Sequence, residues 1–140
     1  MVCFRKKKIL PHSVKKVYSL IADVEKYPVF LPWCNNITVK KRTKKYVVTE
    51  VKVGFKNIIT QYVCKVLLFP GKRISLEYLS GPFEYLKIDW NFKKISNKET
   101  EVDFFCNFKF KSIFLRFLTS FFLENAVKKM VDAFEKKLNN

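Results

Sequence analysis

The feature that most constrains the fold of this chain is a long stretch, residues 36–110, in which apolar and polar residues alternate. A period of two is typical of β-strands that are buried on one face and exposed on the other. Short turn signals, among them PGK, SGPF and SNKE, divide the stretch into six predicted strands. These strands cover residues 37–43, 46–55, 58–69, 73–79, 86–95 and 100–110.

Different patterns flank this stretch. Residues 2–9 predict one more strand, and the segment that follows Ser13 predicts a helix with that serine as its N-cap. The apolar residues of this helix recur at i, i+3, i+4 and i+7 as Val14, Val17, Tyr18 and Ile21.

Two prolines allow no more than a short helical turn in residues 25–31, whereas residues 112–140 return to helical spacing. The order of these elements predicts an α+β fold, with helices on one side of an antiparallel sheet. Neither a linker nor an internal repeat is visible, so we expect one domain over residues 1–140.

The predicted last helix has two unlike halves. Its second half is amphipathic, with an apolar face that includes Phe122, Ala126 and Met130. In its first half, the sector that is polar further along holds aromatic and aliphatic residues. They are Phe114, Phe117, Leu118 and Phe121. Either neighbouring loops cover these side chains, or they form an exposed patch that meets lipid, a partner chain or a hydrophobic ligand.

The charge of the chain is strongly basic, with 28 Lys and Arg against 12 Asp and Glu and a formal net charge of +16. Two runs stand out, RKKK at residues 5–8 and KKRTKK at residues 40–45. Such a charge favours anionic partners, either nucleic acid or an anionic membrane surface. A solvated, lysine-rich surface without a partner has the same composition.

Residues for metal binding or catalysis are scarce. The four cysteines are far apart, without a CxxC pair, which predicts no zinc site and no disulfide framework and indicates a reducing, intracellular setting. The single histidine, His12, precedes a predicted helix among basic residues, and Glu99 and Glu101 lie near a turn. We therefore predict no catalytic residues and no metal, and a binding protein rather than an enzyme.

The apolar segments are too short to cross a bilayer. The N-terminal apolar run does not suffice for a signal peptide, and Arg116 and Glu124 interrupt the most apolar later segment. We expect a protein that does not cross a membrane but can lie against one.

Residues 27–34, YPVFLPWC, carry a resemblance to a known family. They resemble the Tyr-Pro-x-Phe-hydrophobic-Pro-Trp-Cys motif of the coenzyme Q-binding START-domain family, within the polyketide cyclase and lipid-transport group. The resemblance continues through four further segments and covers nearly the whole chain. These segments are residues 53–55, 80–92, 102–112 and 121–137.

This resemblance implies a helix-grip fold, a curved sheet wrapped around the C-terminal helix. It also implies a non-catalytic lipid chaperone that holds ubiquinone or a related polyprenyl lipid, with no covalent cofactor, in support of respiratory electron transport and quinone biosynthesis. The implied mouth of the cavity consists of Tyr27, Pro28, Phe30, Leu31, Pro32 and Trp33, with Gly81, Pro82 and Phe83 opposite. From the alternation, we expect the walls to be Val53, Phe55, Ile88, Trp90, Phe104, Phe108, Phe122, Ala126 and Met130.

Two other functions stay open. The chain is also similar to the bacterial ribosome association toxin family, which would direct the basic runs to rRNA of the large ribosomal subunit. A polyketide cyclase would need polar groups in the cavity, where the alternation places apolar ones.

For the lipid-binding function, we expect a cytoplasmic protein at the inner face of the membrane, on the matrix side if mitochondrial. Membrane contact would then come from Phe114, Phe117 and Phe121.

Overall fold

The computed structural model describes residues 2–55 and 58–140, except for the side chains of residues 55, 58 and 117–122. The chain begins with strand β1 (Val2–Leu10), helix α1 (Val14–Ala22), a 3₁₀ turn (Val24–Lys26) and the short helix α2 (Tyr27–Phe30). Six strands follow: β2 (Cys34–Arg42), β3 (Tyr46–Phe55), β4 (Ile58–Phe69), β5 (Arg73–Ser80), β6 (Phe83–Ser96) and β7 (Glu99–Phe110). The last elements are helices α3 (Ile113–Lys128) and α4 (Met130–Leu138).

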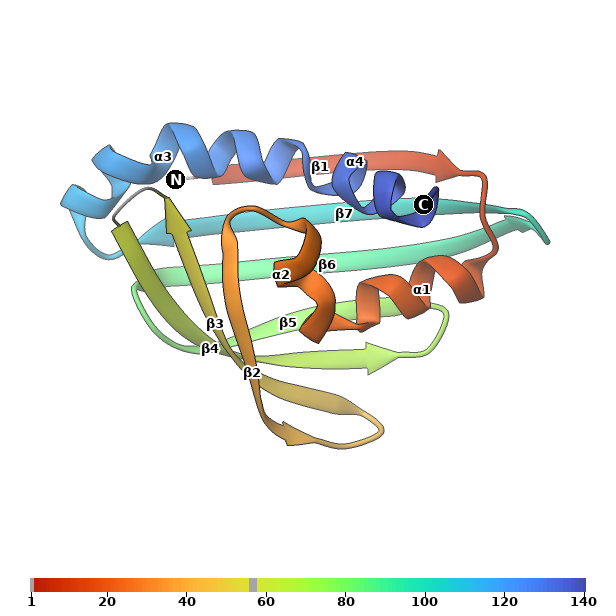
Figure 1. The fold of residues 1–140 in the computed structure, drawn as a ribbon, viewed down its shortest axis with the longest axis horizontal. Coiled ribbons are helices and arrows are strands. Elements are labelled where there is room, and N and C mark those ends of the chain that lie inside the picture. Colours follow the sequence, from red (N-terminus) through yellow and green to blue (C-terminus); the bar gives the residue numbers. More distant parts are fainter. Residues whose placement is uncertain (1, 56–57) are drawn as a thin grey trace.

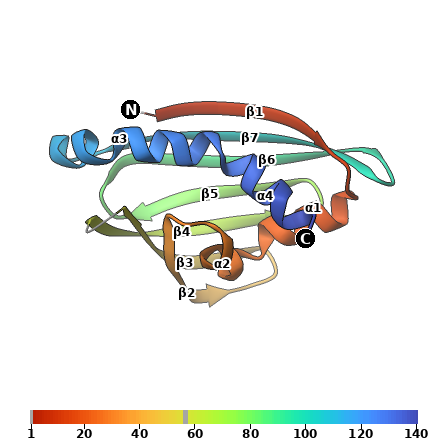
Figure 2. The ribbon, with the colours of Figure 1, turned by 45° about the horizontal axis from the view of Figure 1, so that its top comes forward.

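All seven strands form one antiparallel sheet with the order β1-β7-β6-β5-β4-β3-β2. Figure 1 shows that β2, β3 and β4 run across the direction of β6 and β7, so the sheet curves around the helices. Figure 2 shows the helices together on one side of this sheet. The predicted α+β class and helix-grip fold are confirmed, as is each of the predicted strands.

The predicted alternation of apolar and polar residues is seen as an alternation in the burial of the side chains. In β7, every second residue from Thr100 to Phe110 is buried, and Val102 and Phe104 are wholly enclosed. Since α1 and α4 lie over this face, their apolar residues, such as Val17 and Phe134, complete the core.

The helix boundaries follow from capping. The hydroxyl of Ser13 accepts a hydrogen bond from the Lys16 backbone N–H over 3.3 Å, which confirms the predicted N-cap of α1. Ser112 caps α3 in the same way through Leu115. The last helical segment is interrupted at Lys129, whose N–H reaches back to Asn125 and Ala126, and α4 continues from there. The sequence has neither Gly nor Pro at this break, so it gave no signal for it.

Candidate functional site

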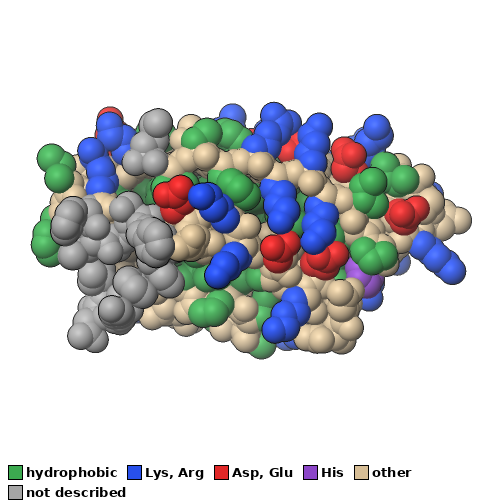
Figure 3. Space-filling view, turned by 90° about the horizontal axis from the view of Figure 1, so that it is seen from above, with side chains coloured by type: hydrophobic (Ala, Val, Ile, Leu, Met, Phe, Trp, Pro, Cys, Tyr) green, Lys and Arg blue, Asp and Glu red, His purple; other side chains and the backbone are tan. Residues whose placement is uncertain are grey.

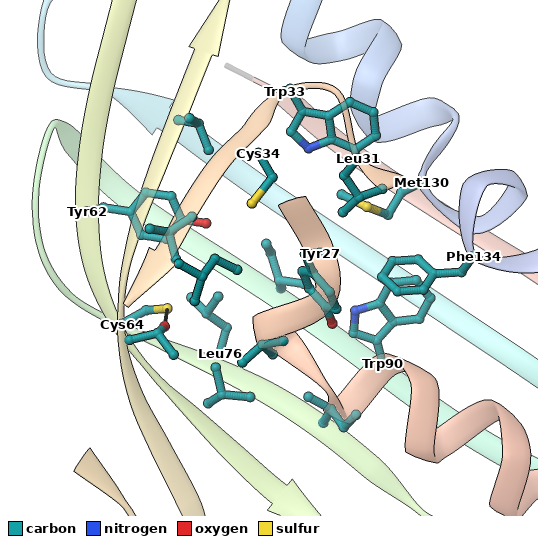
Figure 4. A pocket seen from close by; sticks show the side chains of 18 of the residues that line it. Tyr27, Leu31, Trp33, Cys34, Tyr62, Cys64, Leu76, Trp90, Met130 and Phe134 are labelled. Carbon is teal, nitrogen blue, oxygen red and sulfur yellow. Dashed lines mark hydrogen bonds between the residues drawn. The ribbon is translucent and has the colours of Figure 1, made fainter. Parts of the chain in front are cut away.

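The concave face of the sheet surrounds an apolar cavity of about 100 Å³. Its walls come from β2 to β7, from α2 and the segments that flank it, and from α4 (Figure 4). Among the described residues, the lining contains no Lys, Arg, Asp, Glu or His. A site of this kind is suited to a neutral, mostly apolar molecule, because an unpaired charge would lose its hydration there without compensation.

The proline-rich segment after α1 forms a fixed part of the wall. Pro28 lies in the first turn of α2, where its missing N–H costs no hydrogen bond. The Leu31 N–H bonds the Tyr27 carbonyl over 2.9 Å, and the Cys34 N–H bonds the Leu31 carbonyl over 3.0 Å. The Tyr27 hydroxyl donates to the Ile21 carbonyl, which ties α2 to α1. This segment therefore holds Tyr27, Leu31 and Trp33 against the cavity.

Two cysteines belong to the lining. Cys64 of β4 lies 3.2 Å from the Thr49 hydroxyl of β3, and Cys34 begins β2. Burial raises the pKa of Cys34 to about 11. Burial also raises the pKa of Cys64 to about 11, against a smaller opposing effect of the Thr49 hydrogen bond. Since the thiolate is the nucleophile, both groups are neutral and unreactive near pH 7.

Trp33 separates the cavity from a second depression. It lines both the cavity and a more open groove of about 530 Å³ beside α4. Phe30 forms the groove with Trp33, and lysines of α4, including Lys136 and Lys137, lie at its rim. The Trp33 carbonyl accepts a 3.0 Å hydrogen bond from the Gly54 N–H, which fixes its backbone on β3. The indole is thus the side chain that lies between the apolar interior and this groove.

The structure brings many of the predicted site residues to the cavity. From the predicted mouth, Tyr27, Leu31 and Trp33 line it; from the predicted wall, Val53, Ile88, Trp90, Phe104 and Met130 line it. The side chains of two further predicted wall residues, Phe55 and Phe122, lie outside the described residues.

Other predicted site residues lie elsewhere. Phe30 lines the groove, Pro28 and Pro32 belong to neither lining, and Phe108 and Ala126 are buried in the core. The Gly81–Pro82–Phe83 turn is also outside the lining. Phe83 is buried and stacks on Phe110 with ring centroids 4.6 Å apart.

Several lining residues were not among the predicted site residues, including Cys34, Thr49, Val51, Tyr62, Cys64 and Leu76. The alternation held the signal for some of them, because Thr49 and Val51 share a face of β3 with Val53. Tyr62 and Cys64 share a face of β4 in the same way.

Phe114, a predicted membrane contact, lies at the start of α3 and is 69% exposed, beside Ile113 at 77%. The side chains of Phe117 and Phe121 lie outside the described residues. No helix in the described part of the chain is both long and apolar enough to span a bilayer.

The two basic runs differ in their surroundings. In β1, Arg5 bonds Asp103 over 2.7 Å, and Lys6 and Lys8 reach the α4 acids Asp132 and Glu135. Figure 3 shows this face, on which basic side chains lie next to acidic ones. The RKKK run is therefore largely neutralised by internal ion pairs, so little of its positive charge is available to bind phosphate groups.

The KKRTKK run forms the β2–β3 hairpin, which projects from the body of the sheet in Figure 1. Lys40 and Arg42 meet Glu50 and Glu25, whereas no ion pair is found for Lys44 and Lys45 among the described residues. This hairpin is consequently the more available of the two basic runs.

Known proteins are similar to this chain in sequence and in fold. The family profile of polyketide cyclase / dehydrase and lipid transport proteins matches residues 10–135. The ribosome association toxin RatA of Rickettsia prowazekii is 36% identical over 98% of this chain and 96% of its own length. The mitochondrial coenzyme Q-binding protein COQ10 homolog B of Xenopus laevis is 33% identical over 96% of this chain, which spans only 57% of that protein.

Among solved structures, the Zhui aromatase/cyclase of a Streptomyces species has the same fold, with a TM-score of 0.84. The match covers 98% of this chain and 93% of that one, at 14% sequence identity. At this identity the likeness concerns the fold alone.

Proposed function

Because the chain belongs to the polyketide cyclase / dehydrase and lipid-transport family, we propose that it binds ubiquinone or a related polyprenyl lipid in its cavity. The observation that carries the proposal is the cavity lining, which is free of charged side chains among the described residues. A quinone ring with an isoprenoid tail is neutral and mostly apolar, so it matches these walls. The name of the Xenopus relative, a coenzyme Q-binding protein, supports the same ligand.

Binding requires the lining to move. The cavity of about 100 Å³ is smaller than the ~150 Å³ apolar cavity that holds a benzene molecule in another protein. Trp33 lines both the cavity and the neighbouring groove, and Met130 lines the cavity from α4 (Figure 4). Displacement of the Trp33 indole would join the cavity to the ~530 Å³ groove, which offers the missing room for the ligand.

The protein acts without catalysis in this proposal, as a lipid chaperone for respiratory electron transport and quinone biosynthesis. General acid–base chemistry needs a titratable group near neutral pH within reach of the ligand. His12 is not part of the cavity lining; it bonds Asn139, just after α4, over 2.7 Å and Lys16 of α1 over 3.3 Å. A cyclase-like activity is the least supported alternative for this reason.

The exposed apolar residues of α3 and the basic charge of the chain fit a peripheral position on an anionic membrane, at the inner face or on the matrix side. Ile113 and Phe114 offer an exposed apolar contact, and the net charge of +16 attracts acidic lipids. Each basic residue close to the membrane contributes about 1 kcal/mol to such binding.

Association with the large ribosomal subunit is the second candidate function. It is favoured by the 36% identity to a protein named ribosome association toxin and by the open lysines Lys44 and Lys45 of the β2–β3 hairpin. Contacts of these lysines with rRNA phosphates would weaken steeply with salt.

Extraction of the protein purified from a quinone-producing host, followed by mass spectrometry, tests the proposal. We expect close to one ubiquinone or polyprenyl lipid per chain. A chain that carries no lipid and takes up no added quinone, yet sediments with large ribosomal subunits, would overturn lipid binding in favour of the ribosome.

A further inference from the structure

One polar group of the cavity differs from the others. The hydroxyl of Tyr27 donates to the Ile21 carbonyl, and the Thr49 hydroxyl is paired with Cys64. The hydroxyl of Tyr62 has no hydrogen-bond partner among the described residues, and Figure 4 shows it pointing from β4 into the cavity on the side of Cys34. Tyr62 is half-buried, so its unpaired hydroxyl keeps free space in front of it and offers a donor to an acceptor from a ligand.

The position of Tyr62 is fixed by the turn between β5 and β6. Gly81 adopts a φ of +141° and lies so close that a Cβ at this position would come within 2.7 Å of the Tyr62 Cβ. The Phe83 ring meets the Tyr62 ring edge-on, with centroids 5.5 Å apart. Gly81 and Phe83 therefore position Tyr62, although neither lines the cavity itself.

Tyr62 keeps its proton over the physiological range. Burial raises its pKa well above the ordinary value, and the thiols of Cys64, Cys34 and Cys106 raise it further. The hydroxyl is consequently a permanent donor rather than a proton carrier.

The other unpaired donors of the described lining are the indole N–H groups of Trp33 and Trp90 and the Cys34 thiol, a weak donor on β2. Figure 4 places these rings beside Met130 and Phe134, on the side of the cavity away from Tyr62. The wall made by β3 and β4 thus presents a single unpaired donor among the described residues.

We propose that the Tyr62 hydroxyl donates a hydrogen bond to a carbonyl oxygen of a neutral ligand and so selects a quinone-type head group. This inference rests on lipid binding in the cavity and names the feature of the lipid that is recognised. A carboxylate or phosphate head is disfavoured, because the described lining offers no cation to compensate its desolvation.

The test compares two probes with similar alkyl chains, decylubiquinone and carbonyl-free decylbenzene. Tyr62→Phe removes the hydroxyl alone, and Tyr46→Phe, at a half-buried tyrosine of β3 that is not part of the cavity lining, is the matched control. We expect Tyr62→Phe to weaken decylubiquinone binding about three- to tenfold and to leave decylbenzene binding unchanged. Tyr46→Phe should change neither affinity.

A spectroscopic measurement separates a hydrogen bond from a change in shape. The infrared carbonyl stretch of bound decylubiquinone should lie lower in the unchanged protein than in Tyr62→Phe, since hydrogen bonding weakens the C=O bond. Equal stretching frequencies, or equal losses of both probes, would overturn the role of Tyr62 while lipid binding stands. Failure of the unchanged protein to bind either probe would overturn both proposals.

Discussion

The concave face of the sheet has a packed half and a hollow half. In the packed half, rings fill the space: the Phe134 centroid lies 5.1 Å from that of Tyr27, 5.2 Å from Phe30 and 5.3 Å from Trp90. Tyr27, Trp90 and Phe134 also line the cavity, so this ring cluster forms its wall on that side. In the hollow half, the lining side chains of β3 and β4 are smaller, apart from Tyr62, and the cavity remains. One sheet face can therefore supply stability at one end and a binding space at the other.

The size of the inward side chains and the position of α4 account for the difference. Phe134 reaches the sheet from α4 and meets large rings on β6 and α2. Leu31 and Met130 are among the side chains that line the cavity from outside the sheet, and they leave space unfilled. Predictions that alter one half and spare the other test this division.

The largest effect on stability is expected from Phe134→Ala, in the packed half. Phe134 is 1% exposed, so its truncation should lower the free energy of unfolding by about 3–5 kcal/mol. Chemical denaturation measures this loss. Phe69→Ala, at a ring that is 45% exposed, is the control and should cost less than about 1 kcal/mol. Similar losses for the two variants would contradict the packed half as the main source of stability.

Filling the hollow half should reduce quinone binding without reducing stability. Val51→Phe places a ring in the cavity from β3, so quinone affinity should fall at least about tenfold while the melting temperature is kept or raised. Val48→Phe, on the same strand but outside the lining, is the matched control and should leave affinity unchanged. Unaltered quinone binding in Val51→Phe would place the ligand elsewhere.

Removal of the indole between cavity and groove should have a smaller effect. Trp33→Ala should lower the amount of bound quinone, roughly three- to tenfold through faster dissociation, because the cavity then opens to the groove. Stopped-flow release measures the rate, with the exposed neighbour Val29→Ala as control. Loss of the folded state in Trp33→Ala would instead mean that Trp33 is part of the packed half.

The smallest effect concerns the buried thiols. Burial raises the pKa of Cys106 to about 12 and that of Cys34 and Cys64 to about 11, whereas Cys3 is exposed. Near pH 8, an alkylating reagent should modify Cys3 quickly and the other three slowly.

The same pKa shifts determine how the stability of the folded state changes with pH. The folded state holds these thiol protons more tightly than the unfolded state does. Their stabilising contribution to the free energy of unfolding is therefore complete below the ordinary thiol pKa. It is lost as the pH rises from about 9 towards 11 to 12. Bound quinone should further slow the alkylation of Cys34 and Cys64 but not that of Cys106, which does not line the cavity. Equal protection of all three would contradict the division into halves.

Much of the fold follows from local sequence patterns. The alternation of β6 and β7 predicted that Trp90 and Phe104 face inward, because each strand has one buried face. Capping by Ser13 was equally local. The break at Lys129 was not predictable, since it depends on how α3 and α4 pack rather than on a Gly or Pro in the helix.

The site was predictable only in part, because it depends on contacts between distant segments. The resemblance carried by residues 27–34 implied Tyr27 and Trp33 at the cavity, and the alternation placed Val53 on its wall; all three belong to the cavity lining. The turn at Gly81, predicted as part of the mouth, instead folds against Tyr62, through a positive φ and an irregularity of pairing next to Val63. No spacing along the chain shows this contact.

Fluorescence titration with a short-chain ubiquinone tests the central claim most directly, because Trp33 and Trp90 both line the cavity and a bound quinone quenches nearby indoles. The division into halves predicts saturable quenching at one quinone per chain, lost in Val51→Phe and kept in Val48→Phe. Quenching that rises without saturation, or that is identical in both variants, would contradict a quinone site in the hollow half.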